Sequence, residues 1–245
     1  MRLIRAKNYD DMSLKAANII AAQVSLNPKS VLGLATGSTP IGTYRHLVEW
    51  YQKGELDFGK AVSINLDEYC GLSGEHPQSY RRFMRENLFD HINIPADRSF
   101  LPDGTQTDSA LECARYDRII EEHNGIDVQL LGIGRNAHIG FNEPDSCFAC
   151  GTHQVILTES TIAANTRFFE DEAQVPRKAY SMGMQAIMQA KRVLLIASGA
   201  DKAEAIRNSF FGPVTPQVPA SILQLHRDVI VIADEAALAD CPAEA

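Results

Sequence analysis

The stretch "DVQLLGIGRNAHIGFNEP", Asp127 to Pro144, joins an apolar run to a loop crowded with polar side chains. Glycines and a proline keep this loop from forming a helix. The loop contains Asn136, His138, Asn142 and Glu143. In parallel α/β sheets, ligands bind just beyond the carboxyl ends of the strands. The stretch therefore predicts a buried strand followed by a loop that presents an imidazole and a carboxylate to a ligand.

The same alternation of apolar runs and helical stretches extends along the whole chain. Most of the runs are continuously apolar, which is typical of strands buried on both faces. We predict strands at 31–35, 61–66, 127–133, 153–157, 192–197 and 228–233. Helical spacing of apolar residues predicts helices around 12–24 and at 40–53, 78–89, 107–123, 177–190 and 200–210. We expect a single domain, 1–245, with an α/β fold: a Rossmann-like, doubly wound, mostly parallel sheet with helices on both faces.

The composition excludes several classes of protein. The 245 residues are 45% hydrophobic and 22% charged, as in an ordinary globular domain. The formal net charge of −8 argues against nucleic acid as a partner. No apolar run is long enough for a membrane helix, and the N-terminus has no apolar signal core, so we expect a cytoplasmic protein without a membrane partner.

The cysteines give little support to a metal or redox site. Five cysteines form no disulfide framework. Cys147, Cys150 and His153 have the spacing C-x-x-C-x-x-H, but a zinc site needs a fourth ligand and the chain offers no second pair. We expect free thiols and no metal.

The loop after the predicted strand at 31–35 is a candidate anion site. It reads "ATGSTP", with Gly37, Ser38 and Thr39 before Pro40, and it leads into a predicted helix. Ser38 or Thr39 can cap that helix, and its free N–H groups and dipole suit a phosphate. A capped helix without a ligand explains the same pattern. The loop lacks the G-K-[ST] ending of a Walker A motif, which disfavours ATP hydrolysis.

A pair of carboxylates follows the predicted strand at 61–66. Asp67 and Glu68 are neighbours in "INLDEYCGL". Adjacent side chains on an extended chain point in opposite directions, so one carboxylate can face a cleft while the other pairs elsewhere. A carboxylate at the end of a strand can act as a general base, although a polar strand terminus is the simpler explanation.

The glycines of the opening stretch allow two interpretations. Gly132, Gly134 and Ala137 match a loose dinucleotide motif, but "HIGFNEPDS" is a poor helix start and a cofactor site is disfavoured. Alternatively, the glycines form a tight turn that presents His138 and Glu143, a pair able to shuttle protons near neutral pH. A histidine bonded to the backbone of a structural loop remains a third possibility.

Two cations could complete the anion site. Arg167 lies in the polar segment "ANTRFFEDEAQVP", and Lys202 lies in "ASGADKAEAI" after a predicted strand. A single cation is more often a solvated surface charge. An acidic chain that binds an anion nevertheless needs local positive charge.

Taken together, these motifs resemble the glucosamine-6-phosphate deaminases. The resemblance runs nearly end to end, and its most specific parts are "LDEY" and "HIGFNEP". It is carried by "GLATGSTP", "NLDEY", "GIGRNAHIGFNEP", "NTRFF", "ASGADKA" and "SILQLH".

The resemblance implies a reaction: glucosamine 6-phosphate and water become fructose 6-phosphate and ammonia, without a metal or other cofactor. It implies that Asp67 moves a proton between C2 and C1, that His138 assists opening of the sugar ring, and that Glu143 orients His138. Gly37, Ser38, Thr39, Arg167 and Lys202 match positions of the phosphate site. Residues near 158–180 match an active-site lid.

The chain departs from larger members of that family in two places. Asn136, which the resemblance places among the catalytic residues with Asp67, His138 and Glu143, replaces an aspartate beside the histidine, so Glu143 is left as the carboxylate partner of His138. His153 and Val155 stand where hexameric members carry basic residues that bind the activator N-acetylglucosamine 6-phosphate. The resemblance therefore implies a monomer or small homo-oligomer without this allosteric site.

Two other functions fit parts of the pattern. A 6-phosphogluconolactonase has a similar fold and binds a sugar phosphate, but would lack "LDEY" and the pairing of His138 with Glu143. A non-catalytic phosphosugar sensor is usually fused to a DNA-binding domain, for which this chain has no room.

Overall fold

The computed structural model describes residues 1–166, 169, 171 and 174–242. Within these described residues, seven strands form one sheet in which every neighbouring pair is parallel, in the order β1-β10-β9-β6-β2-β3-β5. The strands are β1 (Arg2–Ala6), β2 (Val31–Leu34), β3 (Val62–Asn65), β5 (Ser99–Phe100), β6 (Val128–Leu131), β9 (Arg192–Ala197) and β10 (Val229–Asp234). The doubly wound α/β fold predicted from the sequence is confirmed.

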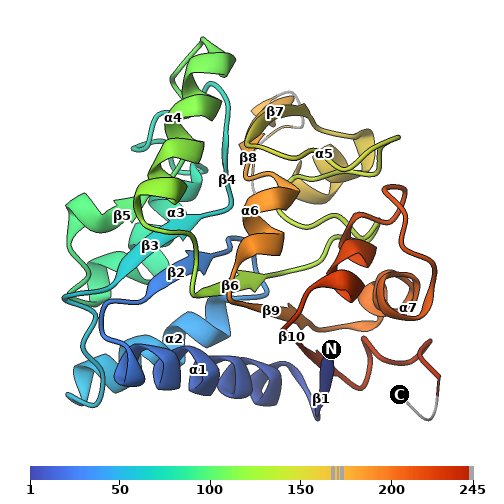
Figure 1. Ribbon diagram of the computed structural model, residues 1–245, viewed down its shortest axis with the longest axis horizontal. Helices are drawn as coiled ribbons and strands as arrows, with labels where there is room; N and C mark the ends of the chain where they lie inside the picture. The colour runs from blue at the N-terminus through green and yellow to red at the C-terminus, as the bar shows by residue number, and fades with distance from the viewer. Residues whose placement is uncertain (167–168, 170, 172–173, 243–245) are drawn as a thin grey trace.

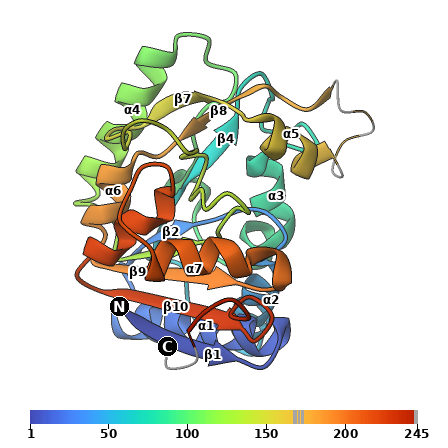
Figure 2. The ribbon, with the colours of Figure 1, turned by 90° about the vertical axis from the view of Figure 1, so that its right-hand side faces the viewer.

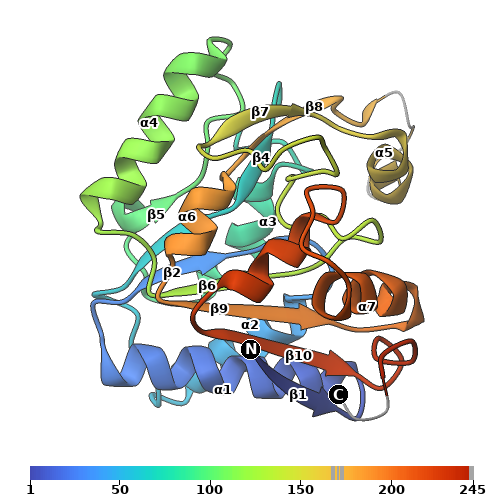
Figure 3. The same cartoon turned by 45° about the vertical axis from the view of Figure 1, so that its right-hand side comes forward.

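Helices cover both faces of this sheet. In Figures 1 and 3, α1 and α2 lie together on one face, and α4 and α6 lie on the other. The α-helices are α1 (Tyr9–Leu26), α2 (Ile41–Gln52), α3 (Tyr80–Asn87), α4 (Ser109–Glu122), α5 (Glu159–Asn165), α6 (Met184–Gln189) and α7 (Ala203–Phe211). Short 3₁₀ helices span Phe89–His91, Ala96–Arg98, Ala200–Lys202 and Pro219–Leu225. None of the described helices is both long and apolar enough to cross a membrane.

The strand order reverses between β2 and β6. From β2 the chain proceeds to β3 and β5 in one direction, and from β6 it proceeds to β9 and β10 in the other. Figure 2 shows β1 at one edge of the sheet, with β10 beside it. At such a reversal the two following loops diverge to opposite faces and leave a crevice. The loops after β2 and β6 are the glycine-rich segments that the sequence singled out.

A small antiparallel sheet lies beyond the main one, and the sequence did not predict it. Its strands are β4 (Asp67–Tyr69), β8 (Lys178–Ser181) and β7 (His153–Ile156), in the order β4-β8-β7. The predicted strand at 153–157 therefore belongs to the edge of this second sheet, and Ile156 is exposed there. The predicted helix at 177–190 was wrong in its first half, which is β8, while α6 forms the second half.

The two sheets are joined through a single residue. The Leu66 N–H donates to the Leu34 carbonyl in the main sheet at 3.2 Å. The Leu66 carbonyl accepts from the Met182 N–H at 2.7 Å, directly after β8. The chain thus leaves β3 and enters β4 without a loop, which puts Asp67 at the carboxyl end of the main sheet.

Close packing between β2 and β6 depends on a glycine. Gly33 pairs with Gln129, and a Cβ at Gly33 would lie 2.1 Å from the Gln129 Oε1 atom. The Gln129 side chain is buried and held by a 2.9 Å hydrogen bond to the Leu130 carbonyl. We expect Gly33→Ala to lower the free energy of unfolding by about 1–3 kcal/mol, because the amide must leave its position.

A double-mutant cycle measured by urea unfolding checks this expectation. Gln129→Ala removes the clashing amide, so Gly33→Ala should cost less in that background than in the wild type. An equal cost in both backgrounds would show that the Gln129 side chain is not what excludes a Cβ at Gly33.

Candidate active site

A cleft of about 880 Å³ opens at the carboxyl ends of the main strands, where the loops after β2, β3, β6 and β9 meet. Residues predicted from separate loops come together in it. Those that line it are Gly37, Ser38, Thr39, Asp67, Asn136, His138 and Lys202. Glu143 lies behind His138, and Arg167 is outside the described residues.

The loop after β2 is ordered by a tyrosine from α1. The Tyr9 hydroxyl donates to the Ser38 carbonyl at 3.1 Å and accepts from the Gly42 N–H at 2.8 Å. The prediction that Ser38 or Thr39 caps α2 was wrong: the N-cap is Pro40, which makes no side-chain capping bond. The side chains of Ser38 and Thr39 line the cleft instead.

Gly37 is needed in this loop for its backbone conformation. Its φ of 91° lies in the left-handed region, where a side chain is strained. No atom lies within 4 Å of the position that its Cβ would occupy. The backbone at Gly37 is therefore open to the cleft, and the start of α2 can be approached by an anion.

Asp67 is a buried carboxylate at the wall of the cleft. Among the described residues, none forms a hydrogen bond with its Oδ1 atom. Burial and the neighbouring Glu68 carboxylate raise the pKa of Asp67 to about 8. A carboxyl group with this pKa can accept and return a proton near neutral pH, as a general base must.

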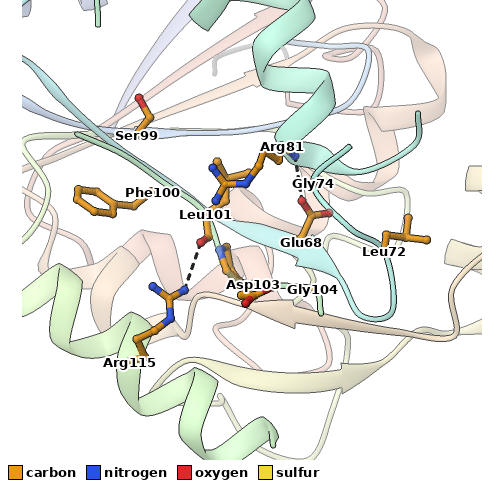
Figure 4. A pocket seen from close by; sticks show the side chains of 11 residues that line it. Glu68, Leu72, Gly74, Arg81, Ser99, Phe100, Leu101, Asp103, Gly104 and Arg115 are labelled. Atoms are coloured by element: carbon orange, nitrogen blue, oxygen red, sulfur yellow. Dashed lines mark hydrogen bonds between the residues drawn. The ribbon is translucent and has the colours of Figure 1, made fainter. Parts of the chain in front are cut away.

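Glu68 points away from the cleft, as the alternation along an extended chain predicts. Its carboxylate accepts from the backbone N–H groups of Tyr69 at 2.9 Å, Tyr80 at 2.8 Å and Arg81 at 2.9 Å. The last two bonds fix the start of α3. Glu68 lines a separate cavity of about 470 Å³ behind β4, together with Arg81 (Figure 4). Glu68 is therefore a structural carboxylate, and Asp67 is the one available for chemistry.

His138 and Glu143 form a pair of titratable side chains, in addition to Asp67. The His138 Nδ1 atom lies 3.6 Å from Glu143 Oε2, and the two side chains are 22% and 6% exposed. Burial alone would raise the pKa of Glu143, but His138, Thr161 and Asn136 outweigh it and lower that pKa to about 2. Glu143 therefore stays ionised and lies next to the imidazole, whose Nδ1 atom is buried and forms no hydrogen bond with the described residues.

A glycine makes room for the imidazole. A Cβ at Gly134 would lie 2.3 Å from the His138 ring, so only glycine leaves the ring in place. The Gly134 N–H donates to the His138 carbonyl at 2.9 Å, and Ala137 between them has a φ of 65°. Gly132, in contrast, has no atom within 4 Å of its Cβ position. The two glycines of this loop thus have different roles, which the sequence interpretation did not separate.

Asn136 has a role that the sequence interpretation missed. Its side-chain NH₂ donates to Glu143 Oε2 at 2.7 Å, and its carbonyl oxygen accepts from the His138 N–H at 3.3 Å. The neutral amide therefore supports the carboxylate beside His138 and does not act on the imidazole directly. Asn142 is structural as well, because its NH₂ donates to the carbonyls of Ile139 and Met182, both at 2.9 Å.

Several residues of the site carried no clear signal in the sequence. Thr161, from α5, donates a short hydrogen bond to Glu143 Oε1 and lines the cleft. Tyr80, at the start of α3, also lines it. Arg135 donates to Asp201 at 3.0 Å at the mouth of the cleft, beside Lys202. These residues come from segments far apart in the sequence, and only the fold brings them together.

Among the described residues, no group of three or more His, Cys, Asp or Glu side chains comes together that could hold a metal ion. Cys147 and Cys150 are exposed free thiols.

Comparison with known proteins identifies relatives of the whole chain. The family model for glucosamine-6-phosphate isomerases and 6-phosphogluconolactonases matches residues 6–232. A glucosamine-6-phosphate deaminase of Lachnoclostridium phytofermentans is 61% identical over 232 residues, covering 95% of this chain and 98% of the relative. A deaminase of Clostridioides difficile is 56% identical over 237 residues, covering 97% and 95%.

Solved structures give a consistent result. A structure described as a monomeric glucosamine-6-phosphate deaminase has a TM-score of 0.96 and 44% sequence identity, covering 98% of this chain and all of that one. A 6-phosphogluconolactonase from Leishmania guyanensis has a TM-score of 0.77 at 20% identity, with 99% of each chain covered. The second likeness is one of fold alone.

The hydrogen bond from Asn136 to Glu143 predicts that a second negative charge at position 136 destabilises the protein. Asn136→Asp would replace the donor by a second carboxyl group and raise the pKa of Glu143, because two carboxylates in contact repel each other. We expect the variant to lower the melting temperature more at pH 7, where both groups are ionised, than at pH 4.5. Differential scanning calorimetry at the two pH values measures this, with Asn136→Ala as the control that removes the donor without adding charge. Equal losses at both pH values would contradict it.

Proposed function

The chain belongs to the family of glucosamine-6-phosphate isomerases and 6-phosphogluconolactonases, and we propose that it is a glucosamine-6-phosphate deaminase. It would convert glucosamine 6-phosphate and water to fructose 6-phosphate and ammonia, in the catabolism of amino sugars in the cytoplasm. Full-length relatives of that name at 52–61% identity support this choice. The lactonases that share the fold are 20% identical or less.

The observation that carries the proposal is the pairing of two proton-transfer groups in one cleft. Asp67 is buried and its Oδ1 accepts no hydrogen bond from the described residues, while His138 is backed by an ionised Glu143. A lactone hydrolase has no need of a group that moves a proton between two carbons. An aldose–ketose isomerisation needs one such group, together with a second one that opens the ring.

His138 would carry out the opening of the pyranose ring. One proton leaves the C1 hydroxyl and one is delivered to the ring oxygen, and breaking the bond between C1 and that oxygen gives the aldehyde. The imidazole faces the cleft while Glu143 holds it from behind, so it can exchange protons with the sugar without losing its orientation.

Asp67 would then move the C2 proton to C1. The amine nitrogen loses one proton and O1 gains one, which leaves an imine at C2 and a hydroxyl at C1. Water adds to the imine carbon and ammonia departs, giving the ketone. These steps are proton transfers and a hydration, and they require no metal or coenzyme.

The phosphate would bind at the start of α2. Gly37, Ser38 and Thr39 line that end of the cleft, and Lys202 reaches it from the loop after β9. Lys202 is only 19% exposed, so its charge acts within the cleft. Arg167 stays a prediction. A grip on the phosphate orients the sugar from a distance and supplies binding energy remote from C1 and C2.

The first experiment measures ammonia released from glucosamine 6-phosphate by the purified protein, with no added metal or coenzyme. Fructose 6-phosphate is assayed in parallel. Equal amounts of both products support the proposal. Absence of ammonia, with hydrolysis of 6-phosphogluconolactone instead, would overturn it.

Substitution of the proposed base separates catalysis from binding. We expect Asp67→Asn to reduce kcat by about 10³-fold or more while the affinity for glucosamine 6-phosphate changes little, since the amide keeps the shape but accepts no proton. Calorimetric titration measures the affinity. Turnover within tenfold of the wild type would remove Asp67 from the mechanism.

The pH dependence of the free enzyme follows from the same group. The pKa of Asp67 is raised to about 8, so the basic form of Asp67 grows as pH rises toward that value. We therefore expect kcat/KM to increase from pH 6 to pH 8. A kcat/KM that is flat over this range would show that Asp67 is already ionised at pH 6.

The protein would act as one domain, as a monomer or small homo-oligomer, without activation by N-acetylglucosamine 6-phosphate. His153 and Val155 on β7 provide no strong positive charge for that phosphate. We expect the effector to leave the rate unchanged at a substrate concentration well below KM. A rate increase would reveal an effector site elsewhere.

A further inference from the structure

We propose that Thr161 is a positioning residue for the His138–Glu143 pair, so that helix α5 must lie against the loop after β6 for the pair to work. This inference rests on the proposed function. It assigns a catalytic consequence to a segment that is separated from Glu143 by the whole of β7.

The two oxygens of Glu143 have different partners. Oε2 accepts from the Asn136 NH₂ at 2.7 Å and faces His138 Nδ1 at 3.6 Å, so the loop after β6 supplies both. Oε1 accepts a short hydrogen bond from the Thr161 hydroxyl. The Thr158 hydroxyl lies 3.3 Å from the same oxygen. One side of the carboxylate is therefore fixed by the loop and the other by α5.

Thr158 and Thr161 form one unit at the start of α5. Thr158 is the N-cap and accepts from the Thr161 N–H at 3.3 Å, and the two hydroxyl oxygens are 3.1 Å apart. A hydroxyl has a single proton, so Thr158 can donate either to Thr161 or to Glu143 at one time. Thr161 is thus the donor on which Oε1 chiefly depends.

Helix α5 also contacts the rest of the protein through an apolar side chain. Ile162 packs into a small apolar cluster with Tyr69 and Phe141, apart from the main core. Tyr69 belongs to β4, the strand that also carries Asp67. Helix α5 is therefore connected to both proton-transfer groups. Thr161 connects it to the His138–Glu143 pair, and the apolar cluster connects it to the strand that carries Asp67.

Loss of the Thr161 hydroxyl has two effects in the same direction. Glu143 can rotate about its side-chain bonds, which disturbs the orientation of His138. The pKa of Glu143 also rises, because a donor to its charged form is gone. The first effect acts at every pH, whereas the second matters only at a pH low enough to protonate Glu143.

The test compares Thr161→Val, which keeps the shape of the side chain, with Thr161→Ser, which keeps the hydroxyl. We expect Thr161→Val to lower kcat about tenfold, with KM nearly unchanged, because the substrate-binding groups stay in place while the orientation of His138 is lost. Thr161→Ser should restore most of the lost kcat. Glu159→Gln in the same helix serves as the matched control and should resemble the wild type, because the ion pair that it removes, with Arg177 at 3.9 Å, is exposed and contributes little.

The outcomes separate the two proposals. A wild-type protein without ammonia release overturns the proposed function, and with it this inference. An active wild type whose kcat survives in Thr161→Val overturns the role of Thr161 alone. A variant that raises KM as much as it lowers kcat, or no recovery in Thr161→Ser, would show that Thr161 only supports the fold. If Thr161→Val does not fold, Thr161→Ala compared with Thr161→Ser decides between the same outcomes.

Discussion

The two backbone hydrogen bonds of Leu66 are the constraint on which the geometry of the site depends. Its N–H belongs to the main parallel sheet and its carbonyl to the small antiparallel sheet, so the chain passes from one to the other within a single residue. A loop at this point would leave the next side chain free to move. Instead Asp67 enters the cleft as part of a strand, and its orientation is fixed by pairing with Ser181. Precision of this kind is what a carbon-to-carbon proton transfer requires.

Burial raises the pKa of both neighbouring carboxyl groups, but to different extents. Glu68 accepts from three backbone N–H groups, which offset part of the cost of burying its charge, and its pKa is raised to about 7. Asp67 Oδ1 has no such donor among the described residues, and the pKa of Asp67 is raised further, to about 8. The protein thus holds one acidic side chain as part of its framework and keeps the other reactive. The same contrast separates Glu143, which is well supplied with donors, from Asp67.

The sequence was informative wherever a local pattern sufficed. Long apolar runs located β2, β3, β6, β9 and β10, because strands buried on both faces admit few polar residues. The strands β1, β4, β5 and β8 were missed, since they are short and most contain charged residues, such as Arg2, Glu68 and Lys178, that do not suggest a buried strand. The loops of the site were located individually for the same local reason. The contact of Thr161 with Glu143 and that of Tyr9 with Ser38 could not be predicted, because they join segments whose proximity only the tertiary fold determines.

The placement of Asp67 and Glu68 on a three-residue strand also limits how this part of the chain can evolve. Side chains alternate along β4, so a deletion or insertion of one residue just after Leu66 would exchange their faces. Such a change would point the Glu68 side chain into the cleft. The first N–H groups of α3 would then lose the carboxylate that accepts their hydrogen bonds. Length variation between the two sheets should therefore be rejected at this junction, and we expect it to accumulate in the turns beyond Tyr69 instead.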